Sequence, residues 1–409
     1  MRILQVNKFH YPRGGADKYF LELSEALTKA GHEVAVFSMK HPKNQLTPYA
    51  KYFVSRLSFN EGNLIDKLKT PGRVIYSLEA KRKFKKLVTD FKPDLIHIHN
   101  IYHQLSPSIL DVAKKFKIPV VMHLHDYKLI CPNYQLFTNG QICEACKPNK
   151  YCACLKKQCF KNSFSKSALV TLEMFIHHRI LKIYAKNIQT LIAPSAFMKE
   201  KIMEFNWPEN KIKVIVNPFS ASLQASEAEL NNPERENYLL FFGRLSKEKG
   251  LLTLIEAAAK TQSHLKFAGS GEEQETLMAA AKKQNVKAEF LGFKSGEELK
   301  QIILKAQAVV IPSIWYENMP LSLLEALNLG KPVLASRIGG LPEIIQEGKN
   351  GYLFNPGEAT DLAEKINLLK ENDLNKIAQF ARQSVQNLSP ENNLQQVMAV
   401  YEEVLSKHK

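Results

Sequence analysis

Short apolar segments alternate with amphipathic segments along most of the chain, and this alternation limits the folds that the sequence can adopt. Asp17–Ala30 has helical periodicity and is closed by Gly31. The expected strands of the first half are Ile3–Val6, Val34–Ser38, Asp94–His99, Pro119–His123, Thr190–Pro194 and Lys213–Val216. Strands that alternate with helices are typical of βαβ units around a parallel sheet. The first half therefore predicts a doubly wound α/β domain.

A second alternating set follows the polar segment Ala221–Arg235, which lacks periodicity and suits an interdomain linker. Its expected strands are Tyr238–Phe242, His264–Ala268, Ala288–Leu291, Ala308–Ile311 and Pro332–Ala335. Its expected helices are Lys249–Lys260, Glu272–Gln284 and Glu297–Ala306, a helix after Pro320 and a helical tail. A chain of 409 residues exceeds the size of one core, so two domains are expected. Ligands of such sheets bind at the carboxyl ends of strands, so we expect the site in a cleft between the domains.

Two carboxylates flank Pro320, which is expected in the first turn of a helix that stops at Gly330. Glu317 precedes this helix, and Glu325 is the only charge between Pro320 and Gly330. A carboxylate on such an apolar helix is costly to bury without a partner. The free amides of the first helical turn favour an anion. The segment predicts two hydroxyl acceptors beside a phosphate seat, although a capped core helix with an isolated Glu is the alternative.

Other loops after expected strands carry residues suited to anions or close backbone approach. Gly243-Arg244 to Lys249-Gly250 offers two cations at the start of a helix. Gly269-Ser270-Gly271 is a weak signal by itself, and Gly14-Gly15 is a glycine turn without a recognised phosphate motif. His125 ends a strand, and a purely structural histidine is the alternative there.

The six cysteines all fall within a short segment, 131–159. Cys143 and Cys146 form a half-site of the spacing that zinc uses. The second half-site is irregular, and its two ligands come from Cys131, Cys152, Cys154 and Cys159, of which we choose Cys154 and Cys159. We expect a structural zinc at Cys143, Cys146, Cys154 and Cys159, with a cysteine-rich loop of no metal-binding role as the alternative. No pattern nearby indicates a catalytic cysteine.

Charge is concentrated in the first half. Residues 1–190 hold 31 Lys and Arg against 13 Asp and Glu, while the whole chain carries a formal net charge of +16. Basic residues gather in Arg73–Lys92, and they alternate with aromatic and aliphatic residues in Lys156–Arg179. Both segments suit an anionic membrane surface, and a solvated basic face is the alternative. No nucleic-acid-binding signature accompanies them.

Neither an apolar run long enough to span a bilayer nor a signal-peptide pattern is found in the sequence. We therefore expect a cytoplasmic protein that attaches peripherally to the inner face of the cell membrane.

Taken together, these motifs resemble the family 4 glycosyltransferases of the GT-B fold, which has two Rossmann-like domains facing a central cleft. The resemblance rests on motif order and spacing from the first strand to about residue 357. The motifs are Gly14-Gly15, His125-Asp126, Gly243-Arg244 to Lys249-Gly250, Gly269-Ser270-Gly271, Phe290-Leu291-Gly292, Glu317 to Glu325, and Gly339-Gly340 to Gly351. Asn318-Met319 departs from the glycine of many relatives, so contacts to the donor sugar are expected to differ.

The resemblance implies a retaining hexosyl transfer from a nucleotide-diphosphate sugar to a glycan or a lipid-diphosphate-linked acceptor in surface polysaccharide synthesis. It implies an acceptor domain over residues 1–220, with the cysteine-rich insertion, and a donor domain over 221–390. The tail 391–409 is expected to pack back on the first domain. Catalytic roles fall on His125, Glu317, Arg244 and Lys249. Donor binding falls on Gly14, Gly15, Arg244, Lys249, Gly269, Gly271, Asn318, Met319, Pro320, Leu321 and Glu325.

Within this resemblance, Glu325 would bind the ribose, and Glu317 would bind hydroxyls of the transferred sugar. Arg244 and Lys249 would neutralise the departing diphosphate. The chain has no Asp-x-Asp motif, which agrees with transfer that requires no metal cofactor. Rival functions are a GT-B sugar-nucleotide epimerase and a non-catalytic, membrane-associated component that binds sugar nucleotides.

Overall fold

The computed structural model describes residues 1–56, 71–231 and 235–408, and these fall into two compact units. Unit 1 comprises Met1–Thr138, Cys143–Val216 and the C-terminal segment from Asn393. Unit 2 comprises Asn139–Ile142 and Asn217–Asn392. Residues 232–234 of the expected linker lie outside the described part of the chain.

Unit 1 is built on a six-stranded parallel sheet with the order β2-β1-β3-β4-β7-β8. The strands are β1 (Arg2–Val6), β2 (Glu33–Phe37), β3 (Leu95–Ile98), β4 (Val120–His123), β7 (Thr190–Ala193) and β8 (Ile212–Val214). The helices are α1 (Gly15–Lys29), α3 (Leu78–Phe91), α4 (Ser108–Lys115), α5 (Cys152–Lys156), α6 (Phe164–Phe175), α7 (Ile183–Asn187) and α8 (Ala196–Glu204). The central strands are buried along their length, as expected for parallel strands covered on both faces.

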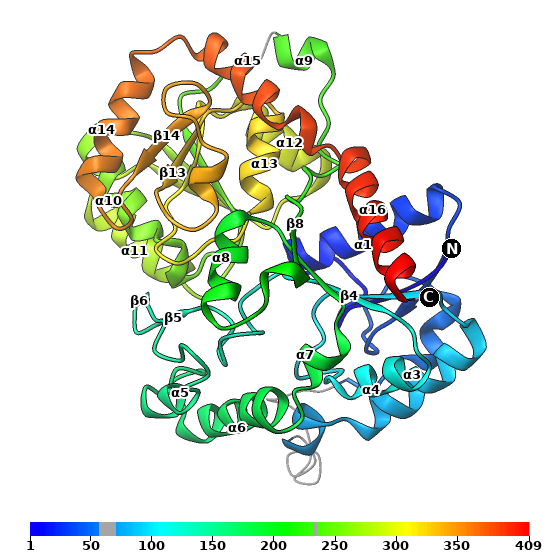
Figure 1. Ribbon diagram of the computed structural model, residues 1–409. Helices are drawn as coiled ribbons and strands as arrows, with labels where there is room; N and C mark the ends of the chain where they lie inside the picture. Colours follow the sequence, from blue (N-terminus) through cyan, green and yellow to red (C-terminus); the bar gives the residue numbers. More distant parts are fainter. Residues whose placement is uncertain (57–70, 232–234, 409) are drawn as a thin grey trace. The chain divides into compact units, whose positions relative to one another are not determined.

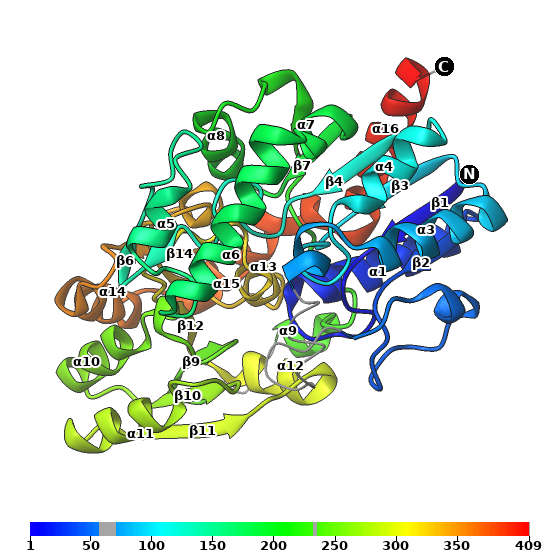
Figure 2. The ribbon, with the colours of Figure 1, turned by 90° about the horizontal axis from the view of Figure 1, so that it is seen from below.

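Helix α16 (Pro390–His408) packs beside α1 on one face of this sheet (Figure 1). Val397, Val400 and Tyr401 of α16 share a buried cluster with Tyr19 and Leu23 of α1. Helices α3 and α4 pack against each other in front of the strands in Figure 2. The apolar side of α3 is buried through Phe84 and its neighbours, so its lysines line the outer side.

Unit 2 holds a second six-stranded parallel sheet, with the order β11-β10-β9-β12-β13-β14. The strands are β9 (Leu239–Phe242), β10 (Leu265–Ala268), β11 (Ala288–Gly292), β12 (Ala308–Ile311), β13 (Val333–Ser336) and β14 (Gly351–Phe354). The helices include α9 (Glu227–Asn231), α10 (Leu251–Thr261), α11 (Gln274–Lys283), α12 (Gly296–Lys305), α13 (Leu321–Asn328), α14 (Ala359–Lys370) and α15 (Leu374–Val385). Their apolar faces meet the strands in one buried cluster.

These two sheets confirm the predicted α/β class with two doubly wound domains. Strand β14 was not predicted, because Gly351–Phe354 is short and follows a glycine-rich turn. Pro320 precedes α13 instead of lying in its first turn. A two-residue hairpin, β5 (Phe137–Thr138) with β6 (Gln141–Ile142), lies within the cysteine-rich segment.

Helix α6 is fixed within unit 1 by a buried ion pair that the sequence did not suggest. Glu173 has no exposed surface, and its Oε2 lies 2.7 Å from Nζ of Lys128 and 3.3 Å from Nε2 of His103. Burial by itself would raise the pKa of Glu173, but Lys128 and His103 outweigh it and lower that pKa. The carboxylate is therefore charged and paired.

We expect Glu173→Leu to lower the free energy of unfolding by about 3–5 kcal/mol, because Lys128 would be left buried and unpaired. The double variant Glu173→Leu/Lys128→Met should recover most of this loss. Urea denaturation of the full chain measures the free energy of unfolding of the single and the double variant. Glu204→Ala is the matched control, since its pair with Lys147 at 2.7 Å is partly exposed and should cost about 1 kcal/mol or less. If Glu173→Leu lowered the free energy of unfolding no more than Glu204→Ala does, the buried pair would not be important for stability.

Candidate active site

The strand order of unit 2 reverses beside β9. The chain runs from β9 outward through β10 to β11, then returns to the other side of β9 with β12, as Figure 2 shows. In open α/β sheets, ligands bind outside the carboxyl ends of the strands at such a reversal. The loops that flank it are 243–250, after β9, and 312–320, after β12. These two loops contain six predicted site residues, namely Arg244, Lys249, Glu317, Asn318, Met319 and Pro320.

An ion pair joins the two loops. Nζ of Lys249 lies 2.7 Å from Oε1 of Glu317, and both side chains are largely buried. The hydroxyl of Ser313 also donates to Glu317, and Nζ of Lys249 lies 5.4 Å from the centre of the Trp315 ring. Burial alone would raise the pKa of Glu317, but Lys249 outweighs it and the pKa is lowered. The pair therefore fixes one cation in a set direction at the sheet reversal.

Arg244 is more exposed than Lys249. Its Nη2 lies 3.1 Å from Oε1 of buried Glu248, while 62% of its side chain is exposed. The carboxylate of Glu248 also accepts from the hydroxyl of Ser246, and its backbone oxygen accepts from the amide of Ile314. Glu248 thus anchors both Arg244 and the second loop, and leaves the guanidinium open to solvent.

Helix α13 begins beside these cations without a side-chain cap. Pro320 is its N-cap residue, and the first amides, on Leu321 and Ser322, have no partner within the helix. Glu325 is buried, as predicted. Met319 is also buried, and its backbone oxygen accepts from Nδ2 of Asn217 at 3.4 Å. Asn318 precedes Met319 in this same loop, which ends at the amides that favour an anion.

Glycines in two loops, after β10 and after β13, allow the site loops to pack tightly. A Cβ on Gly269 would lie 1.8 Å from the oxygen of Gly243, and one on Gly271 would lie 2.0 Å from that of Leu245. Both glycines were predicted to contact the donor. The structure shows in addition that the close packing of the two loops leaves no room for a side chain at either position. Gly339 has φ +62, and a Cβ there would lie 2.2 Å from the oxygen of Glu317. The loop after β13 therefore supports the position of Glu317.

The sheet of unit 1 reverses in the same way, beside β1. Gly14 is the N-cap of α1, Gly15 begins this helix, and both are exposed. Behind them, Asp17 is buried and accepts from Nδ2 of Asn7 at 2.8 Å. Lys8, whose pKa is lowered by burial, lies 4.3 Å from the centre of the Tyr102 ring. Lys8 was missed because nothing in the sequence separates it from the other basic residues of this half.

His125 follows β4 and is partly buried. Its Nε2 lies 2.8 Å from Nδ1 of His99, which comes from the loop after β3. Burial lowers the pKa of both rings well below the ordinary value, so both are neutral. The structure therefore places His125 at the carboxyl edge of the sheet, in contact with a histidine that the sequence left unassigned.

Known protein families match this chain in both halves. Residues 13–222 match the model of Glycosyltransferase Family 4, and residues 224–404 match that of Glycosyl transferases group 1. This chain is a family 4 glycosyltransferase. The predicted family and enzyme class are thereby confirmed.

Relatives and solved structures agree with this assignment. The transferase is 27% identical over 370 residues to an uncharacterized 42.6 kDa protein in the cps region of Klebsiella pneumoniae, covering 87% of this chain and 90% of that protein. Sucrose-phosphate synthase from Thermosynechococcus elongatus superimposes with a TM-score of 0.72 at 19% identity, over 100% of both chains. Anabaena HepE, solved in complex with UDP and glucose, gives 0.68 at 20% identity, over 98% of this chain and 100% of that chain. At such identities the structures show the GT-B fold.

The cysteines of the transferase gather more closely than the sequence shows. Five of them line one small pocket, namely Cys131, Cys143, Cys146, Cys154 and Cys159, while Cys152 is exposed outside it. Cys154 and Cys159 are joined by a disulfide. The predicted four-thiolate zinc set is therefore not formed, because two of its sulfurs are bonded to each other.

Within residues 1–56, 71–231 and 235–408, no group of three or more His, Cys, Asp or Glu side chains is placed to hold a metal ion. Cys131, which the predicted set omitted, is buried in the pocket. Zinc binding by the reduced protein stays a prediction.

A dithiol reductant would supply two electrons and two protons to the disulfide and free two more thiols on this pocket. We then expect about one zinc per chain, lost in Cys146→Ser and kept in the control Cys152→Ser. Burial, followed by the neighbouring Cys131 and Cys143, raises the pKa of Cys146 to about 12, so binding should weaken as the pH falls. Elemental analysis measures the zinc content. Reduced protein without zinc, or zinc retained in Cys146→Ser, would leave the pocket without a metal-binding role.

Proposed function

We propose that this transferase moves a sugar from a nucleotide-diphosphate donor, with retention, to a glycan or lipid-diphosphate-linked acceptor of a surface polysaccharide. The observation that carries the donor half is the Lys249–Glu317 pair at the sheet reversal, beside the uncapped start of α13. HepE was solved with UDP and glucose, and the Klebsiella relative is named for a cps region. Both names support the proposal. Membership of a transferase family weighs against both alternatives, the epimerase and the non-catalytic binding component.

In this proposal the diphosphate lies against the amides of Leu321 and Ser322, with Lys249 and Arg244 beside it. An anion at a helix N-terminus is stabilised by the free amides and by the helix dipole. Buried Glu325 accepts hydrogen bonds from the ribose. Glu317 holds Lys249 in place, and its remaining lone pairs are available to hydroxyls of the sugar.

During transfer, the bond between the anomeric carbon and the leaving phosphate oxygen breaks, and a bond to the acceptor oxygen forms on the same face. The acceptor proton passes to the leaving phosphate oxygen, so atoms and charge balance without a protein base. Negative charge grows on the diphosphate, and fixed cations stabilise that charge more in the transition state than in the ground state. Gly14 and Gly15 are assigned to the donor phosphate and the acceptor, and His125 to the transferred sugar. The transfer step is proposed to need no metal cofactor.

We expect Lys249→Ala to lower kcat by about 10²–10³ while the KM for the donor changes less, because Lys249 acts mainly on charge that develops in the transition state. Lys247→Ala is the matched control, since this exposed lysine lies in the same loop. A thermal-shift screen of UDP-, GDP-, ADP- and dTDP-sugars first identifies the donor, which at a hundred times its Kd stabilises by about 2.7 kcal/mol.

Nucleotide release, measured with that donor and with EDTA present, gives kcat. Equal activity of the two lysine variants would contradict the role of Lys249, and loss of activity on chelation that magnesium restores would contradict metal-free transfer.

We further propose that unit 1 attaches to an anionic membrane face. Helix α6 and the turn after it expose five large apolar side chains, called here the α6 patch: Phe164, Leu172, Phe175, Ile180 and Leu181. Phe164, Leu172 and Phe175 project from one side of the helix, given 3.6 residues per turn. Exposed basic side chains accompany the patch, namely Lys161, Lys166, Arg179 and Lys182. Apolar residues bordered by cations suit the headgroup region of a bilayer.

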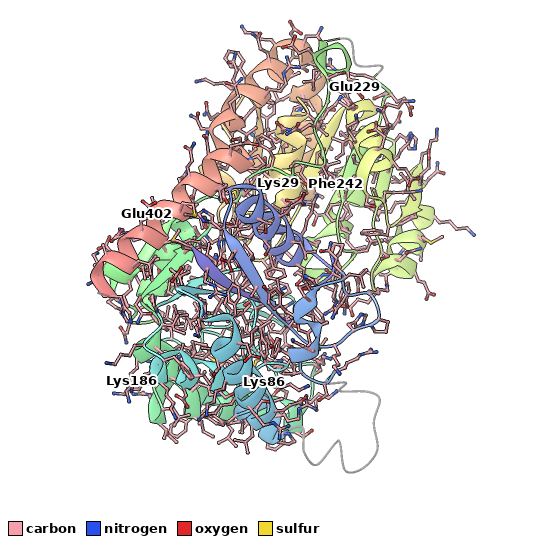
Figure 3. The ribbon with its side chains drawn as sticks, turned by 90° about the vertical axis from the view of Figure 1, so that its right-hand side faces the viewer. Lys29, Lys86, Lys186, Glu229, Phe242 and Glu402 are labelled. Carbon is pink, nitrogen blue, oxygen red and sulfur yellow. A yellow bond between two sulfur atoms is a disulfide. The ribbon has the colours of Figure 1, made fainter. Side chains whose placement is uncertain are left out.

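The basic side of α3 lies on a segment that is close to α6. Nε2 of His177, in the turn after α6, lies 2.6 Å from the backbone oxygen of Ile75, shortly before α3. Figure 3 shows Lys86 of α3 and Lys186 of α7 at the surface of this unit. Lys81 is held by the Tyr76 hydroxyl and faces Asp111 at 3.6 Å, so Arg82, Lys85 and Lys86 are the better group for charge reversal. No helix in the described part of the chain is long and apolar enough to span a membrane.

Binding to vesicles that contain phosphatidylglycerol should weaken with salt, because each basic residue near the surface contributes about 1 kcal/mol that salt screens. Phe164→Ser/Phe175→Ser should release the protein, while Phe293→Ser, an equally drastic change at a phenylalanine that is 73% exposed in unit 2, should not. Arg82→Glu/Lys85→Glu/Lys86→Glu should also release it and leave donor hydrolysis unchanged. Co-sedimentation measures binding. Equal binding by the two phenylalanine variants would remove the α6 patch from this proposal.

A further inference from the structure

Four imidazole rings lie together in the core of unit 1. Those of His99, His123 and His125 are stacked, and that of His97 is tilted against them. His97 lies on β3 and His99 just after it, and His123 ends β4 with His125 two residues further on, so all four project from the same face of the sheet. Ring centres are 4.4 Å apart for His97 and His99, 4.6 Å for His123 and His125, and 5.1 Å for His99 and His125. Only His125 has a place in the proposed function.

A chain of hydrogen bonds links His125 to the C-terminal helix. Nε2 of His125 lies 2.8 Å from Nδ1 of His99, and Nε2 of His99 lies 2.9 Å from Oε1 of Gln5 on β1. The amide nitrogen of Gln5 donates to the hydroxyl oxygen of Tyr401 at 3.3 Å. Tyr401 is fully buried on α16 and also lies 2.6 Å from Nδ1 of His97. Residues almost four hundred positions apart are thus joined in one polar network.

This chain determines where the protons lie. A neutral imidazole carries one N–H, and the hydrogen bond at one nitrogen sets the role of the other. The carbonyl end of Gln5 can only accept, so Nε2 of His99 carries the proton and Nδ1 of His99 accepts. Nε2 of His125 must then donate to His99. Nδ1 of His125 is therefore the acceptor nitrogen of its ring.

The orientation of Gln5 is the deciding element. Its amide has a donor end and an acceptor end, and the hydroxyl of Tyr401 could in principle pair with either one. When that hydroxyl donates its proton to Nδ1 of His97, 2.6 Å away, its oxygen can only accept, and the donor end of Gln5 then faces it. If the amide were reversed, Gln5 would donate to His99, and every proton along the chain would move to the other nitrogen. His125 would then carry its proton on Nδ1.

We propose that Gln5, oriented by Tyr401 of α16, is a positioning residue that fixes the proton of His125 on Nε2 through His99, so that Nδ1 accepts a hydrogen bond from a sugar hydroxyl. The sugar contact rests on the proposed function, whereas the proton arrangement does not. Through Tyr401, the C-terminal helix controls the chemistry of a side chain that belongs to β4 and its loop.

The direct test is ¹⁵N NMR of protein labelled at histidine, with His125→Gln used to assign the His125 signals. In the wild type we expect the ¹⁵N signal of a protonated nitrogen at Nε2 of His125 and that of an unprotonated nitrogen at Nδ1. Tyr401→Phe and Gln5→Met should each give a mixture of the two forms. Tyr19→Phe is the matched control, because Tyr19 is buried against the same rings and donates to Asn393 of α16 at 3.1 Å but has no part in the chain.

The second measurement is transfer activity with the donor found by thermal shift. Tyr401→Phe should lower kcat about tenfold, which corresponds to one lost hydrogen bond in the transition state, and should leave the Kd for the donor unchanged. Tyr19→Phe should retain wild-type kcat. Thermal denaturation of each variant shows whether it is folded.

A proton on Nδ1 of His125 in the wild type would overturn the proposal, as would identical spectra for Tyr401→Phe and Tyr19→Phe. Failure of the proposed function would give a different result. The wild type would then show the expected spectrum but transfer no sugar from any donor in the panel.

Discussion

The ion pair of Lys249 with Glu317 connects the two loops to which we assign the donor. These loops leave β9 and β12, strands that are adjacent in the sheet but separated by about seventy residues of sequence. A lysine alone in such a loop would sample many rotamers, and the buried carboxylate limits it to one direction. Gly339 brings the loop after β13 against Glu317, so a third loop supports the same carboxylate. The cation is therefore preorganised before any ligand arrives, which is the condition for electrostatic stabilisation of a transition state.

Unit 1 uses buried polar groups in a different way. Glu173 meets Lys128 and His103, and Asp17 meets Asn7, so each buried charge has a hydrogen-bonded partner. The stacked histidines stay neutral because burial disfavours their charged forms. Because His99 and His125 are both neutral, one ring donates and the other accepts in the hydrogen bond between them. The C-terminal helix closes this core through Tyr401 and completes both the packing and the hydrogen-bond chain.

The cysteine-rich segment shows how spacing alone can mislead. Cys143 and Cys146 have the spacing of a zinc half-site, and this spacing led to a ligand set with Cys154 and Cys159. In the structure these last two are bonded to each other, and Cys131 from an earlier loop joins the pocket. Which sulfurs meet depends on how the hairpin and α5 fold back on the loop after β4, and this is not encoded in the distance between cysteines along the chain.

The sequence by itself determined the class of fold, because short apolar strands that alternate with amphipathic helices leave few other arrangements. It also located the loops at the carboxyl ends of the strands, with Arg244, Lys249 and Glu317 on them and Glu325 on the helix that follows. Tertiary structure alone decided the partners. Lys249 pairs with Glu317, Glu173 with Lys128, and Gln5 with both His99 and Tyr401, over separations that periodicity does not reach. The physical reason is that periodicity reports which face of an element is buried, whereas a hydrogen bond requires two particular atoms about 3 Å apart, and only the packed chain sets that distance.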